Sequence, residues 1–169
     1  MSVSTIIDRS LAKAKFDLAP PHRHPSFPRV VVATVLAVAG SLLADAALVA
    51  IGTSLFPATK GYVHFQFHDY AKLTIVGVIV ACVAWPMVTR VSSAPRWIFL
   101  RLAVLVTLVL FLPDLWILAK GQPPRAVAVL VVMHLAIAVV TYNLLVHVAT
   151  VGSDNRRTPH QDRDSHPAT

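Results

Sequence analysis

The 169-residue chain is 56% hydrophobic and only 14% charged, and its mean hydropathy is +0.66. Because soluble domains carry roughly 25% charged residues, this composition excludes an ordinary soluble protein. The formal net charge of +7 comes from Lys and Arg residues in the tails and in short links beside apolar stretches. That placement is typical of membrane topology and not of nucleic-acid binding.

Residues 1–29 form a polar, basic segment that precedes the first apolar stretch. Ile7, Leu11, Ala14 and Leu18 recur at helical spacing among basic residues, a pattern that predicts a short helix lying on an anionic membrane surface. A disordered tail explains the same composition equally well. With either structure, we expect the segment to be a cytoplasmic tail.

Four apolar stretches follow, at residues 30–56, 71–88, 97–119 and 126–149. A helix crosses the hydrocarbon core of a bilayer in about 20 residues, with a range of roughly 17 to 25, so each stretch is predicted to be a membrane span. Because the links between them are short, we predict an all-α fold, an up-down bundle of four transmembrane helices. The polar residues 150–169 are predicted to be disordered.

The Lys and Arg residues lie mostly on one side of the predicted bundle. Eleven of the fifteen fall in the amino-terminal segment, around the link between the second and third spans, or in the carboxyl-terminal segment. The four on the other side are Lys60, Lys72, Lys120 and Arg125. By the positive-inside rule, we expect a multi-pass protein of the inner (plasma) membrane with both termini in the cytoplasm.

The first span carries small residues along one side, among them Ala33, Ala37 and Ser41. Small residues at this spacing let helix backbones approach closely in lipid. Asp45 follows Ser41 by four residues and therefore projects from nearly the same face. Since a charged side chain is costly inside a bilayer, we expect Asp45 to point into the bundle or toward a partner.

The first link, residues 57–70, is the most aromatic part of the chain. Within it, His64 and His68 are four residues apart, and Asp69 follows them. On a helix this spacing places both imidazoles on one face, where they could bind a divalent metal together with the carboxylate. The alternative is a hydrated interfacial loop that binds no metal, and the spacing alone does not decide between the two.

Three ionisable residues of the spans fall in the outer half of the predicted bundle. At 1.5 Å of helical rise per residue, Asp114 lies about 6 Å from the outer end, His134 about 12 Å and Asp45 about 16 Å. Ionisable residues at such depths usually face a cavity or a partner. We hypothesise that the three line one polar pocket that opens outward.

Asp45 also has a purely structural interpretation. Its carboxyl group could hold the bundle in register by hydrogen bonding to a neighbouring helix, through Tyr142, Asn143 or His134. Ser41 belongs to the same polar set, because it shares the face of Asp45. The substitution Asp45→Asn separates the interpretations: a hydrogen-bonded structural role largely survives it, whereas a proton-carrying or cation-binding role does not.

Three functional classes remain. A non-enzymatic accessory or scaffold subunit, packing on a larger membrane complex through the small-residue face, is the favoured interpretation. The alternative is a proton-coupled transporter of small molecules or lipids that works as a homo-oligomer around Asp45. An enzyme is disfavoured and no cofactor is expected, because the chain has a single cysteine, Cys82, no serine nucleophile motif and no Gly-rich phosphate loop.

Two short motifs carry a resemblance to known proteins: Leu112-Pro113-Asp114 late in the third span and Met133-His134 in the fourth. Together with the apolar sequences around them, they resemble an uncharacterised actinobacterial family of small four-helix integral membrane proteins. The resemblance implies four spans and a place in the plasma membrane of an actinobacterium. It implies no substrate and no catalytic residues.

Overall fold

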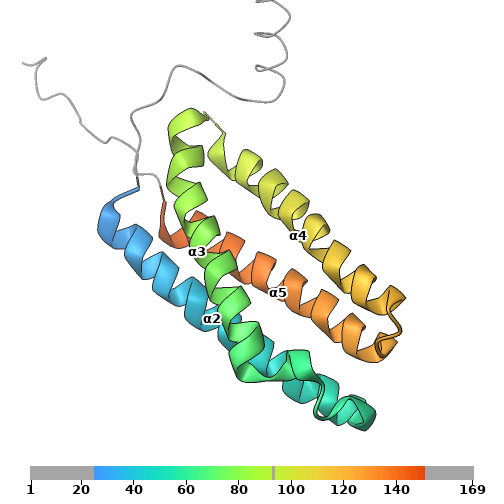
Figure 1. Cartoon of the computed structure of the whole chain (residues 1–169). Helices are drawn as coiled ribbons and strands as arrows, with labels where there is room; N and C mark the ends of the chain where they lie inside the picture. The colour runs from blue at the N-terminus through green and yellow to red at the C-terminus, as the bar shows by residue number, and fades with distance from the viewer. Residues whose placement is uncertain (1–24, 93, 151–169) are drawn as a thin grey trace, which may run out of the picture.

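A computed structural model of the protein describes residues 25–92 and 94–150. The described residues form four long helices and two short 3-10 turns, with no strand among them. In chain order these are α2 (Phe27–Leu55), η1 (Pro57–Thr59), η2 (Val63–Phe65), α3 (Phe67–Val91), α4 (Pro95–Ala119) and α5 (Pro124–Val148) (Figure 1). The predicted all-α fold of four helices is confirmed. The predictions of an interfacial helix near the amino terminus and of a disordered carboxyl-terminal tail lie outside the described residues.

All four helices are long and apolar enough to cross a membrane. The shortest have 25 residues, and a helix of that length extends about 38 Å. This exceeds the roughly 30 Å of a bilayer's hydrocarbon core. The protein is therefore a multi-pass membrane protein with four candidate spans.

Helix α3 is longer than the span predicted for it at residues 71–88. It begins at Phe67, so the last residues of the predicted link form its first turn. Asp69 lies in that turn, where a carboxylate is favoured by the positive end of the helix dipole. At its other end α3 also exceeds the predicted span: Pro86 lies inside the helix, which continues to Val91. Membrane helices tolerate an internal proline when neighbouring groups satisfy the freed backbone.

The helices pack as a chain of neighbours around α2 and α5. Helix α2 packs most extensively on α5, while α3 packs on α2 and α4 packs on α5. Figure 1 shows α2 and α5 running side by side. Helices α3 and α4 contact each other much less than these pairs do, so the bundle is open along the seam between them.

The close pairing of α2 with α5 uses the small-residue face of α2. Ala33, Ala37 and Ser41 are fully buried, and Ser41 Oγ lies 3.5 Å from Thr141 Oγ1 on α5. Methyl groups added at Gly52 would lie only 2.8 Å from Val129 of α5. The expectation that this face packs on another protein is therefore wrong: the chain's own fourth helix covers it.

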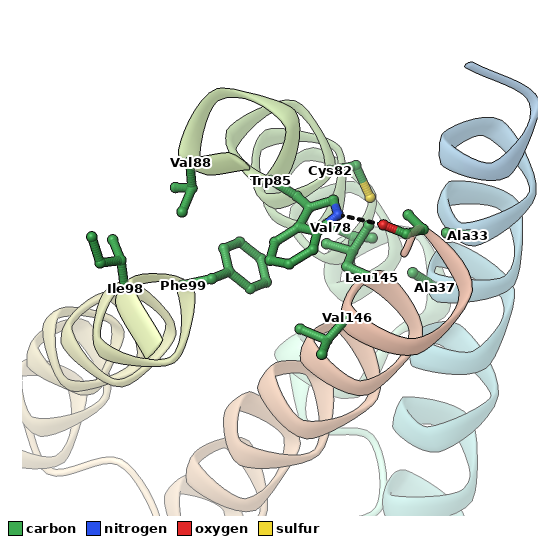
Figure 2. Close-up of a cluster of buried hydrophobic side chains, with 11 residues drawn as sticks. Ala33, Ala37, Val78, Cys82, Trp85, Val88, Ile98, Phe99, Leu145 and Val146 are labelled. Atoms are coloured by element: carbon green, nitrogen blue, oxygen red, sulfur yellow. Dashed lines mark hydrogen bonds between the residues drawn. The ribbon is translucent and has the colours of Figure 1, made fainter. Parts of the chain in front are cut away.

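An aromatic cluster joins three helices at one end of the bundle, and Figure 2 shows two of its members, Trp85 and Phe99. We call this the terminal end, because α2 begins there, α3 ends there, α4 begins there and α5 ends there (Figure 1). Trp85 Nε1 of α3 donates a hydrogen bond of 2.9 Å to the carbonyl oxygen of Ala149. The Phe99 ring of α4 meets Trp85 edge-on, with ring centroids 5.1 Å apart, and stacks on Tyr142 of α5. The opposite end carries residues 56–66 and 120–123 and is called the loop end.

The substitution Gly52→Ala tests the close packing of α2 on α5. Val129 has one strongly preferred rotamer in a helix, so it cannot turn away from a methyl group 2.8 Å from its Cγ2 atom. We expect the overpacking to cost about 1–3 kcal/mol, measured as a lower thermal midpoint in detergent. Gly77→Ala is the matched control, because a methyl group there meets no atom within 4 Å. Equal midpoints for the two variants would contradict the packing.

Candidate functional site

A groove of about 790 Å³ runs along the open seam of the bundle. Helices α3 and α4 form its walls and α5 forms its floor. Most of its lining is aliphatic, and lining residues such as Leu73 and Val106 are also exposed on the outer surface of the helices. The groove is therefore open to the side, toward the space that lipid occupies around the four helices.

A histidine–carboxylate pair lies in this groove near the loop end. Asp114 of α4 and His134 of α5 both line the groove, and His134 Nδ1 lies 3.0 Å from Asp114 Oδ2. This is an ion-pair distance, although the approach does not have the geometry of a hydrogen bond. The Asp114 side chain is only 6% exposed and that of His134 is 26% exposed. The structure thus brings together two of the three residues of the hypothesised polar pocket.

Asp45 lies behind the groove rather than in it. It is fully buried, and Thr74 Oγ1 of α3 donates a 2.7 Å hydrogen bond to its Oδ2 atom. Thr74 itself lines the groove, so one side chain separates Asp45 from the open space. His134 is close enough to Asp45 to interact with it electrostatically. Within residues 25–92 and 94–150, Asp45 Oδ1 has no hydrogen-bond partner.

Of the hydrogen-bond partners expected for Asp45, Tyr142 and Asn143 bond elsewhere and His134 interacts with it only electrostatically, whereas Thr74 donates the hydrogen bond. Tyr142 lies near the terminal end, where its hydroxyl donates to the Arg96 carbonyl oxygen at 3.4 Å. Asn143 Nδ2 donates to the carbonyl oxygen of Val139 in its own helix. The sequence signal for Thr74 was only that it is a hydroxyl residue in an apolar span. With the helix bounds of the structure it lies about 11 Å from the loop end by helical rise, and Asp45 lies about 15 Å from it.

Of the two alternatives for His64, His68 and Asp69, the structure does not favour the metal site. Gln66 has an extended backbone and separates η2 from α3. His64 and His68 therefore do not share one helix, and their four-residue spacing does not place both imidazoles on one helical face. His68 Nε2 lies 3.2 Å from Asp69 Oδ1 with its side chain 62% exposed, while His64 packs its ring against Tyr62. No group of three potential ligands suited to a metal ion occurs among the residues that the structure describes.

The loop end of the groove is nevertheless its polar end. His64 and Asp69 line it there, beyond Asp114 and His134. The hydroxyl of Tyr62 is buried nearby without a hydrogen-bond partner in the described part of the chain. Burial raises the pKa of the Tyr62 phenol, and the negative charge of Asp114 raises this pKa further. The groove therefore combines a long apolar part with one polar end, which is lined by two carboxyl groups and two imidazoles.

Comparison with known protein families shows which family the chain belongs to. A model described as a family of unknown function, DUF6069, matches residues 22–150. The chain belongs to the DUF6069 family. The match spans all four helices, so the DUF6069 region contains the groove and both buried carboxyl groups. No curated protein and no solved structure matches the chain.

The hydrogen bond between Thr74 and Asp45 can be tested by Thr74→Val, which removes the hydroxyl and keeps the size of the side chain. Leaving a buried polar atom unsatisfied costs about 1–3 kcal/mol, so we expect a lower thermal midpoint in detergent. Thr74→Ser is the control, because it keeps the hydroxyl and loses only a methyl group. A valine variant as stable as the serine variant would show that the hydrogen bond contributes nothing to stability.

Proposed function

We propose that this DUF6069 protein is a non-enzymatic membrane protein that binds a lipid-like amphiphile in the groove between α3 and α4. The observation that carries the proposal is the groove itself, about 790 Å³ in volume. Ligand sites in proteins typically measure roughly 300–1,000 Å³ and are mostly apolar with a few convergent polar groups. An amphiphile from the surrounding bilayer fits this groove, since its chain would lie along the aliphatic walls and its head group near Asp114.

This proposal replaces the accessory or scaffold role that the sequence favoured. That role relied on the small-residue face of α2 to bind a larger complex, and α5 covers this face. The groove is the larger unfilled feature that remains in the described part of the bundle. Ligand binding is also preferred over proton-coupled transport, because the aromatic cluster of Trp85, Phe99 and Tyr142 closes the groove at the terminal end.

The non-enzymatic assignment is supported by how the hydroxyl groups of the groove are used. Thr74 donates to Asp45, and Thr107 donates to a carbonyl oxygen of its own helix. Thr141 shares a buried contact with Ser41. A nucleophile needs an adjacent base within hydrogen-bonding reach. Thr107 and Thr141 contact only a carbonyl oxygen and a serine hydroxyl, and the one carboxyl group that a threonine of the three meets is that of Asp45, which is fully buried.

We further propose that the protein lies in the plasma membrane, in keeping with the actinobacterial resemblance, and has both termini in the cytoplasm. Four antiparallel helices put both α2–α3 and α4–α5 links at the loop end, with Lys60 and Lys120. Arg90 and Arg96 lie at the terminal end together with the two described chain ends. Under the positive-inside rule the groove then has its polar end near the outer surface.

Cysteine labelling tests this orientation in a Cys82→Ser background, in which the buried native cysteine is removed. Lys60→Cys at the loop end should react with a membrane-impermeant maleimide in intact cells. Arg90→Cys at the terminal end should react only after the membrane is permeabilised. Labelling of Arg90→Cys, but not of Lys60→Cys, in intact cells would reverse the proposed orientation.

A groove-filling substitution tests ligand binding. Gly77 lines the groove, and space around its Cα is open, so Gly77→Phe should occupy the groove without disturbing the fold. The probe is hexadecanol bearing a diazirine, photo-crosslinked to the protein in phosphatidylcholine nanodiscs. Because the phenylalanine ring would occupy the volume that the ligand's alkyl chain needs, we expect the apparent affinity for the probe to fall about tenfold, equivalent to about 1.4 kcal/mol.

The matched control for this test is Val83→Phe. Val83 lies on the same helix and is 55% exposed, but it does not line the groove. This variant should crosslink as the wild type does. Equal crosslinking of the wild type, Gly77→Phe and Val83→Phe would contradict binding in the groove.

A further inference from the structure

We propose that the amphiphile bound in the groove carries a cationic amine head group, which donates hydrogen bonds to Asp114 at the loop end. The inference rests on the proposed ligand-binding function and names the chemical class of its ligand. The choice of a cationic amine follows from the unsatisfied hydrogen-bond acceptors at this end of the groove, from the charged residues around them, and from the lipid that surrounds the protein.

Two buried carboxyl groups near this end each keep one oxygen without a hydrogen bond among the described residues, and only Asp114 lines the groove. Asp114 Oδ2 lies 3.0 Å from His134 Nδ1 without hydrogen-bond geometry, and the Asp114 side chain is only 6% exposed. Asp45 Oδ1 is likewise without a partner in that part of the chain, behind Thr74. A buried polar atom without a partner costs free energy, and a donor placed in the groove beside Asp114 would remove that cost.

The charges around the groove select a cation over an anion. Asp69, Asp114 and, one layer behind, Asp45 contribute carboxyl groups near the loop end. The basic side chains that line the described groove are two imidazoles, His64 and His134, with no Lys or Arg among the lining residues. An anionic head group such as a phosphate needs Arg or Lys donors, so it would meet repulsion here.

The aromatic side chains at this end also suit an ammonium group. Tyr70 lines the groove, and the rings of Tyr62 and Phe65, which flank the groove-lining His64 in the chain, pack edge-on against each other. The face of a tyrosine ring attracts a cation through its quadrupole.

In a bilayer, the contact with the head group has to provide the selectivity of the groove for its ligand. The aliphatic walls of the groove resemble lipid tails, so an alkyl chain gains little by moving from lipid into the groove. From Asp114 to Phe99 the groove follows 15 residues of α4, about 22 Å by helical rise, which accommodates a long single chain. Selection among chains of this kind therefore has to come from the polar end, where Asp114 lies.

The test is competition in phosphatidylcholine nanodiscs between the diazirine-bearing hexadecanol tracer and two unlabelled amphiphiles of equal chain length. Hexadecylamine should displace the tracer at about tenfold lower concentration than hexadecanol, since hydrogen bonds to charged groups are stronger than neutral ones. Asp114→Asn should abolish this preference, whereas Asp114→Glu should keep most of it. Because each variant is compared in the same nanodiscs, partitioning of the amine into lipid cancels.

Equal displacement by hexadecylamine and hexadecanol in the wild type would overturn the cationic head group, and this comparison needs no variant to fold. An amine preference that persists in a folded Asp114→Asn protein would overturn the assignment to Asp114. In both cases, tracer crosslinking that still falls in Gly77→Phe leaves the groove as a ligand site. If tracer crosslinking in Gly77→Phe instead equals that of the wild type, ligand binding in the groove, and with it the proposed function, is contradicted.

Discussion

The close approach of α2 and α5 is the constraint on which the rest of the bundle depends. Lipid provides no hydrophobic drive for helices to associate, so backbone proximity and packing have to supply it. Ala33, Ala37 and Ser41 give α2 a face that α5 can meet closely, and all three are fully buried. Helix α3 then attaches to α2 and α4 attaches to α5. Two outer helices held by different partners need not touch each other, and the groove is the space between them.

Two polar contacts fasten these outer helices in the half of the bundle nearer the loop end. The hydrogen bond from Thr74 to Asp45 joins α3 to α2, and the pair of Asp114 and His134 joins α4 to α5. Each contact secures one wall of the groove to the central helices, and neither crosses the groove. At the terminal end, by contrast, Trp85 binds the end of α5 and packs on Phe99. Helices α3 and α4 are thus in contact at the terminal end and separated by the groove toward the loop end.

This division gives the groove its chemical asymmetry. The apolar part of the groove consists of aliphatic side chains, which any membrane helix carries toward lipid. This part therefore needs no functional explanation. The polar end differs, because a charged or hydrogen-bonding group inside a bilayer is costly unless it has a partner. Asp114 and Asp45 each retain one acceptor atom without a hydrogen bond among the described residues. The amine proposal assigns a use to the acceptor on Asp114 and places it where the groove can deliver a ligand.

The sequence by itself determined the four membrane helices, because each satisfies its own backbone and its length and apolarity can be read along the chain. It also placed Asp45 on the buried face, since residues four apart share one side of a helix, and it put Asp114 and His134 in the same half of the bundle. Only the tertiary structure decided that α5 covers the small-residue face, that Thr74 pairs with Asp45, and that the break at Gln66 separates His64 from His68. These outcomes depend on how each helix is rotated and shifted against its neighbours. Lipid-facing and protein-facing residues are equally apolar in a membrane, so the sequence pattern does not record that rotation.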